Sequence, residues 1–154
     1  MASIDLGESM TITLEELLAE RSIYRNLVAF ARAMDERDWQ AFAAITSADL
    51  TANMGRGELT GRDAIITFMR SFLDNCGPTQ HLLGNVTIDV DGDRAKSSAY
   101  VCDMHLGNSD HPDLTFRTLG RYKDEWVKID DCWRMVRRVK DNRGWVGSLE
   151  IFDQ

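Results

Sequence analysis

The spacing of apolar residues divides the chain into a helical first half and a second half of alternating strands. From residue 14 to residue 39 apolar residues recur every three or four positions, which predicts one long amphipathic helix. Thr13 followed by Glu16 has the spacing of a capping box, which fixes the start of this helix. Similar apolar repeats predict a short second helix from Trp39 to residues 46–47, and a third helix between residues 60 and 78.

After residue 79 the period changes from helical to alternating, as expected for strands. The sequence Asp91-Gly92-Asp93 predicts a tight hairpin turn within this region. A further short strand, broken by glycines at residues 55–57, is expected before the third helix. The apolar tail, residues 144–152, is expected to close one end of a cavity or to pack on a neighbouring subunit. The predicted strands cover residues 50–54, 80–90, 94–106, 114–126 and 132–140.

Helices followed by long antiparallel strands describe an α+β domain with its helices on one face of a curved sheet. Such a sheet can fold round the first helix and enclose a pocket, where small molecules commonly bind. The chain has 154 residues, enough for one domain with a substantial core but not for two of ordinary size. We expect a flexible N-terminal arm over residues 1–12 and a single domain over residues 13–154.

The first helix carries an acid where the pattern expects an apolar residue. Steps of three and four from Leu17 through Tyr24 and Val28 lead to Asp35, which places Asp35 on the predicted inward stripe near the end of the helix. A carboxylate there must be paired, hydrated or functional, because burying an unpaired charge is costly. Alternatively, Asp35 lies past the helix end and caps a turn with residues 36–38.

The composition of the chain argues against several classes of partner. With 18 Lys and Arg against 25 Asp and Glu, the formal charge is -7, so nucleic acid and anionic membranes are not expected as main partners. Basic residues do cluster between Arg117 and Arg143, which leaves a local positive site open. Three cysteines without a Cys-x-x-Cys pair, no signal peptide and no apolar run of membrane-spanning length together predict a cytoplasmic protein.

Three histidines are the main candidates for acid–base chemistry, because imidazole titrates near neutral pH. His81 begins the first long strand, and His105 lies near the end of the next, with Asp103 on its own face. His111 lies in a polar loop and is expected to be exposed. A carboxylate beside an imidazole orients it and stabilises its protonated form, although a strand histidine can equally be a hydrogen-bonded structural residue.

No metal or cofactor is expected. His81, His105, Asp103 and Asp35 could be assembled as ligands, but their spacing matches no zinc signature. The chain has no G-x-S-x-G, P-loop or G-x-G-x-x-G motif, which argues against a hydrolytic serine, nucleotide chemistry and a dinucleotide cofactor.

In the last strand, alternation places Arg137 on the face of Trp133 and Met135, and Arg138 on the opposite face. Hydrophobicity alone would turn the Trp133 face inward and leave Arg138 as a solvated charge. Apolar residues elsewhere are core by default, and some can line a pocket. The candidates for substrate contact are Tyr24, Phe30, Met34, Met54, Phe68, Phe72, Met104 and Phe116.

Several stretches together resemble the SnoaL-like branch of the nuclear transport factor two superfamily, over roughly residues 13–147. The resemblance implies a cone of three helices against a strongly curved, mainly antiparallel sheet, assembled as a homodimer or homotrimer. The stretches that carry it are Leu17 to Trp39 with its end Ala33-Met34-Asp35-Glu36-Arg37-Asp38-Trp39, Gly61-Arg62-Asp63-Ala64-Ile65, Thr79-Gln80-His81 followed by Asn85-Val86, and Tyr122-Lys123-Asp124 leading to Trp133-Arg134.

Within that superfamily, Asp35 and His81 resemble the catalytic dyad of scytalone dehydratase, bile-acid 7α-dehydratase and hexachlorocyclohexane dehydrochlorinase. In those enzymes the histidine takes a proton from carbon, the aspartate orients it, and water or chloride is eliminated. By the same resemblance, His105 matches the second histidine of scytalone dehydratase. Arg138 matches an active-site arginine of the dehydrochlorinase, which contradicts the face count above.

The sequence departs from these relatives at three positions. Met34 and Met54 stand where scytalone dehydratase has tyrosines that hold a water on the substrate carbonyl, and Phe30 stands where the bile-acid enzyme has a tyrosine. Carbonyl activation as those enzymes perform it is therefore not expected at these positions. The base itself is retained.

These observations predict a cofactor-independent lyase of the dehydratase type. His81, oriented by Asp35, would remove a carbon-bound proton from an apolar cyclic or aromatic substrate, and His105 and Arg138 would assist the leaving group or stabilise negative charge. An isomerase or polyketide-type cyclase could use the same base. A non-catalytic protein that binds small molecules is the third possibility, because fold alone does not decide among them.

Overall fold

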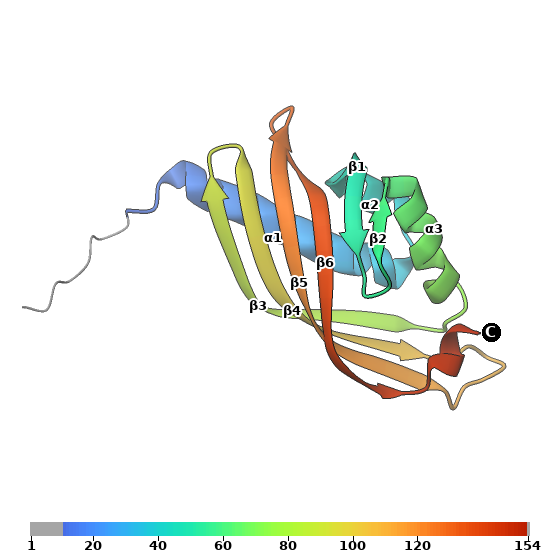
Figure 1. The fold of residues 1–154 in the computed structure, drawn as a ribbon. Coiled ribbons are helices and arrows are strands. Elements are labelled where there is room, and N and C mark those ends of the chain that lie inside the picture. Colours follow the sequence, from blue (N-terminus) through green and yellow to red (C-terminus); the bar gives the residue numbers. More distant parts are fainter. Residues whose placement is uncertain (1–10, 154) are drawn as a thin grey trace, which may run out of the picture.

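The computed structural model describes residues 11–153 and contains three helices, six strands and a short C-terminal 3₁₀ helix, η1 (Leu149–Phe152) (Figure 1). The predicted N-terminal arm, residues 1–12, lies outside the described residues except for Thr11 and Ile12. The helices are α1 (Leu14–Glu36), α2 (Trp39–Ile45) and α3 (Arg62–Leu73). The strands are β1 (Thr46–Asn53), β2 (Glu58–Thr60), β3 (Thr79–Asp91), β4 (Arg94–Leu106), β5 (Thr115–Ile129) and β6 (Cys132–Gly147).

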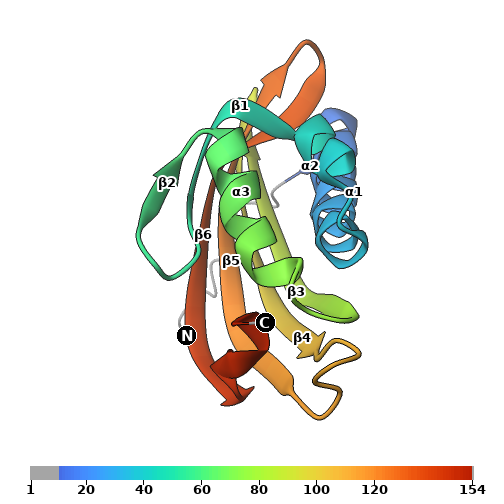
Figure 2. The same ribbon diagram turned by 90° about the vertical axis from the view of Figure 1, so that its right-hand side faces the viewer.

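The strands form one sheet in the order β2-β1-β6-β5-β4-β3. Only the β1–β6 pair among these is parallel, and every other neighbouring pair is antiparallel. The long strands bend sharply along their length, α1 crosses one face of the sheet, and α3 lies at the end where the C-terminal segment returns (Figures 1 and 2). The predicted α+β architecture, with three helices on a strongly curved and mainly antiparallel sheet, is confirmed.

Helix α1 begins as predicted, but its inward face differs from the prediction. The side chain of Thr13 accepts a hydrogen bond from the backbone of Glu16, and the Glu16 carboxylate reaches back to Thr13, which completes the capping box. The predicted inward stripe is wrong at Leu17, Tyr24 and Val28, which are 49%, 42% and 36% exposed, whereas Leu27, Ala31 and Met34, on or beside the stripe nearer the helix end, are buried. Apolar residues lie on more than one side of this helix, and at the three exposed positions the sheet covers a different side from the one that was predicted. That buried side carries Ile23, Leu27, Phe30 and Met34.

A bulge in β3 changes which residues of the strand face inward. Before the bulge the odd-numbered residues face inward, and after it the even-numbered residues do. The pairing with β4 shifts between Gly84 and Thr87, and Asn85 adopts a positive φ of 49°. The extra residue reverses the alternation, as bulges do. His81 therefore faces the same side of the sheet as the half-buried apolar residues further along β3, which pack toward α1.

A second bulge, at Val136 in β6, overturns the prediction that Arg138 is solvated. Glu125 of β5 pairs with Arg137 of β6, but the next residue of β5, Trp126, pairs with Met135. Val136 lies between these two partners and is therefore the extra residue. Strict alternation fails at that point, and Arg138 faces inward on the same side as Met135. Arg138 is 1% exposed, whereas Arg137 points outward to an ion pair with Glu58.

The inward-facing Arg138 lies in the centre of the core. Its guanidinium donates two hydrogen bonds to Asp124, with nitrogen–oxygen distances of 2.6 and 2.7 Å. The same group lies 3.7 Å from the ring centre of Phe30 and 3.9 Å from that of Tyr122. Asp124 also accepts a hydrogen bond from Ser97. The guanidinium therefore packs against two aromatic rings within a buried ion pair, in which each charge depends on the other.

The described surface also carries exposed apolar side chains on the outer face of the sheet, among them Leu82, Tyr100 and Leu119. The predicted homodimer or homotrimer stays a prediction. Within residues 11–153, no helix combines the length and apolarity needed to cross a membrane.

Replacing Asp124 with Asn should lower the free energy of unfolding by about 3–5 kcal/mol, because the buried Arg138 charge loses its counterion. The matched control is Glu58→Gln, which breaks the neighbouring surface pair with Arg137 and should change stability by about 1 kcal/mol or less. Urea unfolding followed by circular dichroism measures both. Equal effects of the two substitutions would contradict this account of the core.

Candidate active site

The site begins at the end of α1, which Arg37 fastens to α3 and β3. Arg37 adopts a left-handed conformation with φ 57° and ends the helix. Its guanidinium donates hydrogen bonds to backbone oxygens at the ends of α1 and α3, including Asp35 and Leu73, and to the hydroxyl of Thr79 at 2.8 Å. One side chain thus joins three elements. This fixes Asp35 relative to His81, which lies two residues beyond Thr79.

Asp35 and His81 form a close pair. The Nδ1 atom of His81 lies 2.7 Å from Asp35 Oδ1, and the backbone N–H of His81 donates to Asp35 Oδ2 at 3.0 Å. Thr79 donates a third hydrogen bond to Oδ1, also at 3.0 Å. Because Asp35 can only accept when ionised, Nδ1 carries a proton, and in the uncharged form of the ring Nε2 is the nitrogen without one.

The environment of Asp35 keeps its carboxylate ionised. Partial burial disfavours the charged form, but the hydrogen bonds from the ring and backbone of His81, the charge of His81 and the hydroxyl of Thr79 outweigh burial. The pKa of Asp35 therefore lies below its ordinary value. Asp38 takes the capping role that the alternative assigned to Asp35, because its carboxylate accepts the first N–H groups of α2.

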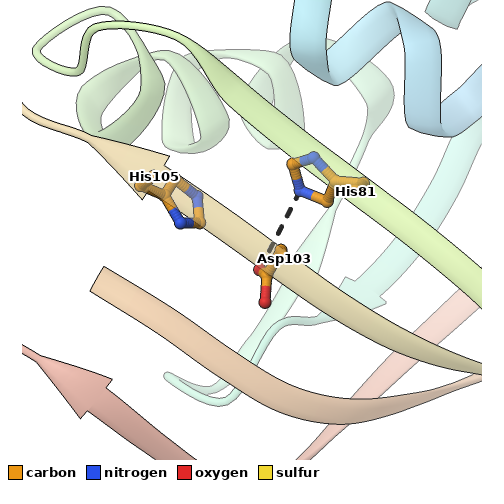
Figure 3. Close-up of side chains that lie close together, drawn as sticks. All are labelled: His81, Asp103 and His105. Atoms are coloured by element: carbon orange, nitrogen blue, oxygen red, sulfur yellow. Dashed lines mark ion pairs between the residues drawn. The ribbon is translucent and has the colours of Figure 1, made fainter. Parts of the chain in front are cut away.

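A row of polar residues crosses the sheet beside the dyad. His81, Asp103 and Thr118 are direct partners on β3, β4 and β5, and Figure 3 shows Asp103 facing His81 with His105 further along β4. Asp103 Oδ2 lies 3.9 Å from His81 Nε2. Asp103 also accepts hydrogen bonds from Thr118 and, at 2.7 Å, from Lys140.

The pKa of Asp103 is also lowered. Burial would raise this pKa, but the charges of Lys140 and His81 and the hydrogen bonds from Lys140 and Thr118 outweigh it. A carboxylate therefore faces the unprotonated nitrogen of His81. It would stabilise the imidazolium that forms when His81 takes a proton.

His105 is the second histidine of the site and is electrically neutral at physiological pH. Burial lowers its pKa to about 4, although the charge of Asp103 and the hydrogen bond to Phe116 act in the opposite direction. Its Nδ1 lies 3.3 Å from the backbone oxygen of Phe116, and its ring centre lies 5.8 Å from that of His81. His105 can exchange a hydrogen bond with a bound molecule, but it brings no positive charge.

These residues border a cavity of about 320 Å³. Phe152 of η1 packs against Phe72 of α3 and Phe116 of β5, with ring centres 5.3 and 5.1 Å apart, so the C-terminal segment closes one side. This agrees with the first of the two roles expected for the tail. The polar lining consists of Arg56, His81, Asp103, His105, Thr118, Tyr122, Lys140 and Asn142; the apolar lining consists of Met54, Phe68, Met69, Phe72, Leu73, Phe116, Trp145, Leu149 and Phe152.

The structure brings together three of the four predicted catalytic residues, namely Asp35, His81 and His105. The fourth, Arg138, faces inward but is held in the core by Asp124 and does not line the cavity. Of the predicted substrate contacts, four line the cavity: Met54, Phe68, Phe72 and Phe116.

The other four predicted contacts lie elsewhere. Phe30 and Met34 are buried between α1 and the sheet, and Tyr24 is exposed on the outer side of α1. Met104 alternates with Asp103 and His105 and therefore points to the opposite face of β4.

Five polar residues of the cavity wall were not predicted from the sequence: Arg56, Thr118, Tyr122, Lys140 and Asn142. The inward face of β5 offered one signal, since Thr118 and Gly120 interrupt a row of aromatic residues at every second position. Lys140 gave none, because the bulge at Val136 hides which residues of β6 face inward.

Two histidines and a carboxylate could also hold a metal ion. His81, Asp103 and His105 each offer a ligand atom, and these atoms lie within 4.8 Å of one another. The ammonium of Lys140, however, already binds Asp103 at 2.7 Å and would repel a cation at the same oxygen. The charges therefore suit proton transfer better than metal binding.

The fold and the dyad define a small α+β protein with a buried, carboxylate-bound histidine at the wall of a pocket. The SnoaL-like domain model matches residues 15–139, and the chain belongs to this family. A protein of Mycobacterium tuberculosis named only as uncharacterized is 28% identical over 137 residues, which cover 88% of this chain and 92% of that protein.

Solved structures share the fold. A proposed scytalone dehydratase of Novosphingobium aromaticivorans has a TM-score of 0.79 and 24% identity, covering 89% of this chain and 92% of that one. A hexachlorocyclohexane dehydrochlorinase has a TM-score of 0.78 and 16% identity, covering 88% and 92%. At such identities the likeness establishes the fold alone.

The buried, neutral His105 should make the protein less stable in mild acid. Its pKa is about 4 when folded against an ordinary value of 6.5. Between these values the unfolded chain binds more protons, so stability is lost as the pH falls from about 6.5 toward 4. From pH 7 to pH 5, His105 should account for a fall of about 2 kcal/mol in the free energy of unfolding.

Urea unfolding at the two pH values measures this fall. The variant His105→Phe should lose most of it, and the control His111→Ala, which changes an exposed loop histidine, should retain the wild-type dependence. A wild-type fall that survives in His105→Phe would show that other groups cause it.

Proposed function

We propose that the protein is a cofactor-independent lyase in which His81 removes a carbon-bound proton from an apolar cyclic or aromatic substrate. The observation that carries this proposal is the dyad geometry: Asp35 holds Nδ1 at 2.7 Å and leaves Nε2 free to accept a proton beside an apolar-walled cavity. Neighbours of the same fold that are named dehydratases or dehydrochlorinases support the reaction class by analogy.

In this proposal the two carboxylates share the work of stabilising the protonated base. Asp35 hydrogen-bonds one side of the imidazolium, and Asp103 faces the other at 3.9 Å. The electrons of the broken C–H bond form the new double bond, and the leaving group departs with its bonding pair. The neutral His105 offers a hydrogen bond to the departing group. The apolar walls strengthen these interactions by excluding water.

An isomerase or cyclase would begin with the same proton abstraction. In isomerisation the proton returns to another carbon, and in cyclisation a new carbon–carbon bond forms. Product mass separates elimination, which loses the leaving group, from isomerisation and aldol cyclisation, which both keep the mass of the substrate. Because Arg138 is held in the core, it cannot assist the leaving group. In this proposal that role falls to His105 and Lys140, which line the cavity.

Incubation in deuterated water with a panel of hydroaromatic and cyclic ketones and alcohols tests the proposal. Wild-type protein should incorporate deuterium at carbon or release a leaving group, and His81→Ala should do neither. Asp35→Asn should slow the reaction by about 10²–10⁴-fold, because an amide can donate to Nδ1 and favour the wrong tautomer. Mass spectrometry and NMR follow both outcomes.

His111→Ala serves as the matched control and should react at the wild-type rate. Circular dichroism checks that His81→Ala is folded. A folded His81→Ala that reacts normally would contradict the proposal. Equal binding of an apolar ligand by wild type and His81→Ala, with no chemical change in either, would point to a binding protein.

A further inference from the structure

Lys140 reaches the polar row from a neighbouring strand through a gap that a glycine provides. The side chain starts on β6 and reaches Asp103 on β4, so it must cross the inward face of β5. Gly120 of β5 lies on this route. A Cβ atom there would lie 3.1 Å from Lys140 Cε and 3.1 Å from Val101 Cγ1, closer than almost all such contacts. The absence of a side chain at Gly120 makes room for the lysine.

The ammonium that arrives by this route has hydrogen-bonding capacity left. A lysine has three N–H donors. Within residues 11–153, Lys140 uses two of them, on Asp103 at 2.7 Å and on Thr118 at 3.0 Å. Its side chain is only 9% exposed, yet it lines the cavity. A buried cation with a donor to spare can bind an oxygen of a molecule in that cavity.

The His81 ring and the ammonium both lie close to one carboxylate oxygen. Asp103 Oδ2 lies 2.7 Å from Lys140 Nζ and 3.9 Å from His81 Nε2. A fragment in which a C–H bond neighbours a carbonyl group can therefore direct its hydrogen toward Nε2 and its oxygen toward Nζ. Proton removal from such a fragment places negative charge on the carbonyl oxygen, where a cation stabilises it.

We propose that Lys140 is a catalytic residue that binds this oxyanion, and that the substrate is a carbonyl compound with a leaving group on the carbon beyond the acidic one. This inference rests on the proposed lyase function and names its substrate class. Lys140 thereby supplies the carbonyl activation that the tyrosine positions, occupied here by Met34 and Met54, do not.

His81 Nε2 takes the proton, the C–H pair becomes the carbon–carbon double bond of an enolate, and the carbonyl π pair moves to the oxygen held by Lys140. The enolate then re-forms its carbonyl, and a new double bond expels the leaving group. The imidazolium of His81 returns its proton to that group, so the products are an α,β-unsaturated carbonyl compound and, for a hydroxyl leaving group, water.

Alternatively, Lys140 only neutralises the charge of Asp103. Comparing two variants distinguishes this structural role from a catalytic one: Asp103→Asn, and the double variant Lys140→Met with Asp103→Asn. They differ only in the ammonium, and neither leaves a buried Asp103 charge unpaired. The double variant Lys128→Met with Asp131→Asn, at a surface pair, controls for the loss of a lysine–aspartate pair elsewhere.

The first readout is the binding of 4-nitrophenol, whose ionised form is coloured and mimics an enolate. Asp103→Asn should bind nitrophenolate more tightly than wild type, because the competing carboxylate is gone. Adding Lys140→Met should weaken nitrophenolate binding by about tenfold or more. Equal binding by Asp103→Asn and the double variant would overturn the inference.

The second readout is deuterium exchange next to the carbonyl of cyclic β-hydroxy ketones. Exchange in the Lys140→Met double variant should be about 10²–10³-fold slower than in Asp103→Asn. Equal rates in these two variants, with exchange still abolished by His81→Ala, would overturn the role of Lys140 and leave the lyase proposal standing. No exchange in wild type would overturn the lyase, and with it a catalytic role for Lys140, even if nitrophenolate binding depends on the ammonium.

Discussion

The hydrogen bond between Asp35 and His81 is the constraint on which the rest of the site depends. It joins the last turn of α1 to the first residues of β3 and decides which imidazole nitrogen faces the cavity. Arg37 holds the two elements at the distance this bond requires, because its guanidinium binds backbone oxygens of α1 and α3 and the hydroxyl of Thr79. The fold thus places Nε2 of His81 at the cavity wall, where the proposed reaction needs a proton acceptor.

Two buried ion pairs of similar composition serve different ends because of their surroundings. Arg138 and Asp124 are almost fully buried, and the guanidinium packs against the rings of Phe30 and Tyr122, so each charge depends on the other. Lys140 and Asp103 lie in the wall of the cavity, where a bound molecule can compete for them. The two pairs differ in whether they lie in the core or in the cavity wall. The residue types alone, lysine or arginine with aspartate, do not distinguish these two positions.

Much of this fold was predictable from sequence, since capping signals, the 91–93 turn and the change from helical to alternating periodicity are local. The pairing of Asp35 with His81 came from family resemblance, because no local rule brings together residues so far apart in the chain. The bulge in β6 was not predictable from the sequence. The extra residue at Val136 reverses the faces of β6, and so Arg138 was misplaced by alternation and Lys140 went unnoticed.

The most direct test is the tautomer of His81 in the resting protein. Histidine labelled with ¹⁵N and observed in long-range ¹H–¹⁵N NMR spectra at mildly alkaline pH distinguishes a proton on Nδ1 from one on Nε2. The account predicts that His81 carries its proton on Nδ1 in the wild type, with Nε2 unprotonated, and that Asp35→Asn shifts the proton toward Nε2. A wild-type His81 protonated on Nε2 would contradict the account, because the nitrogen facing the cavity could not then accept a proton.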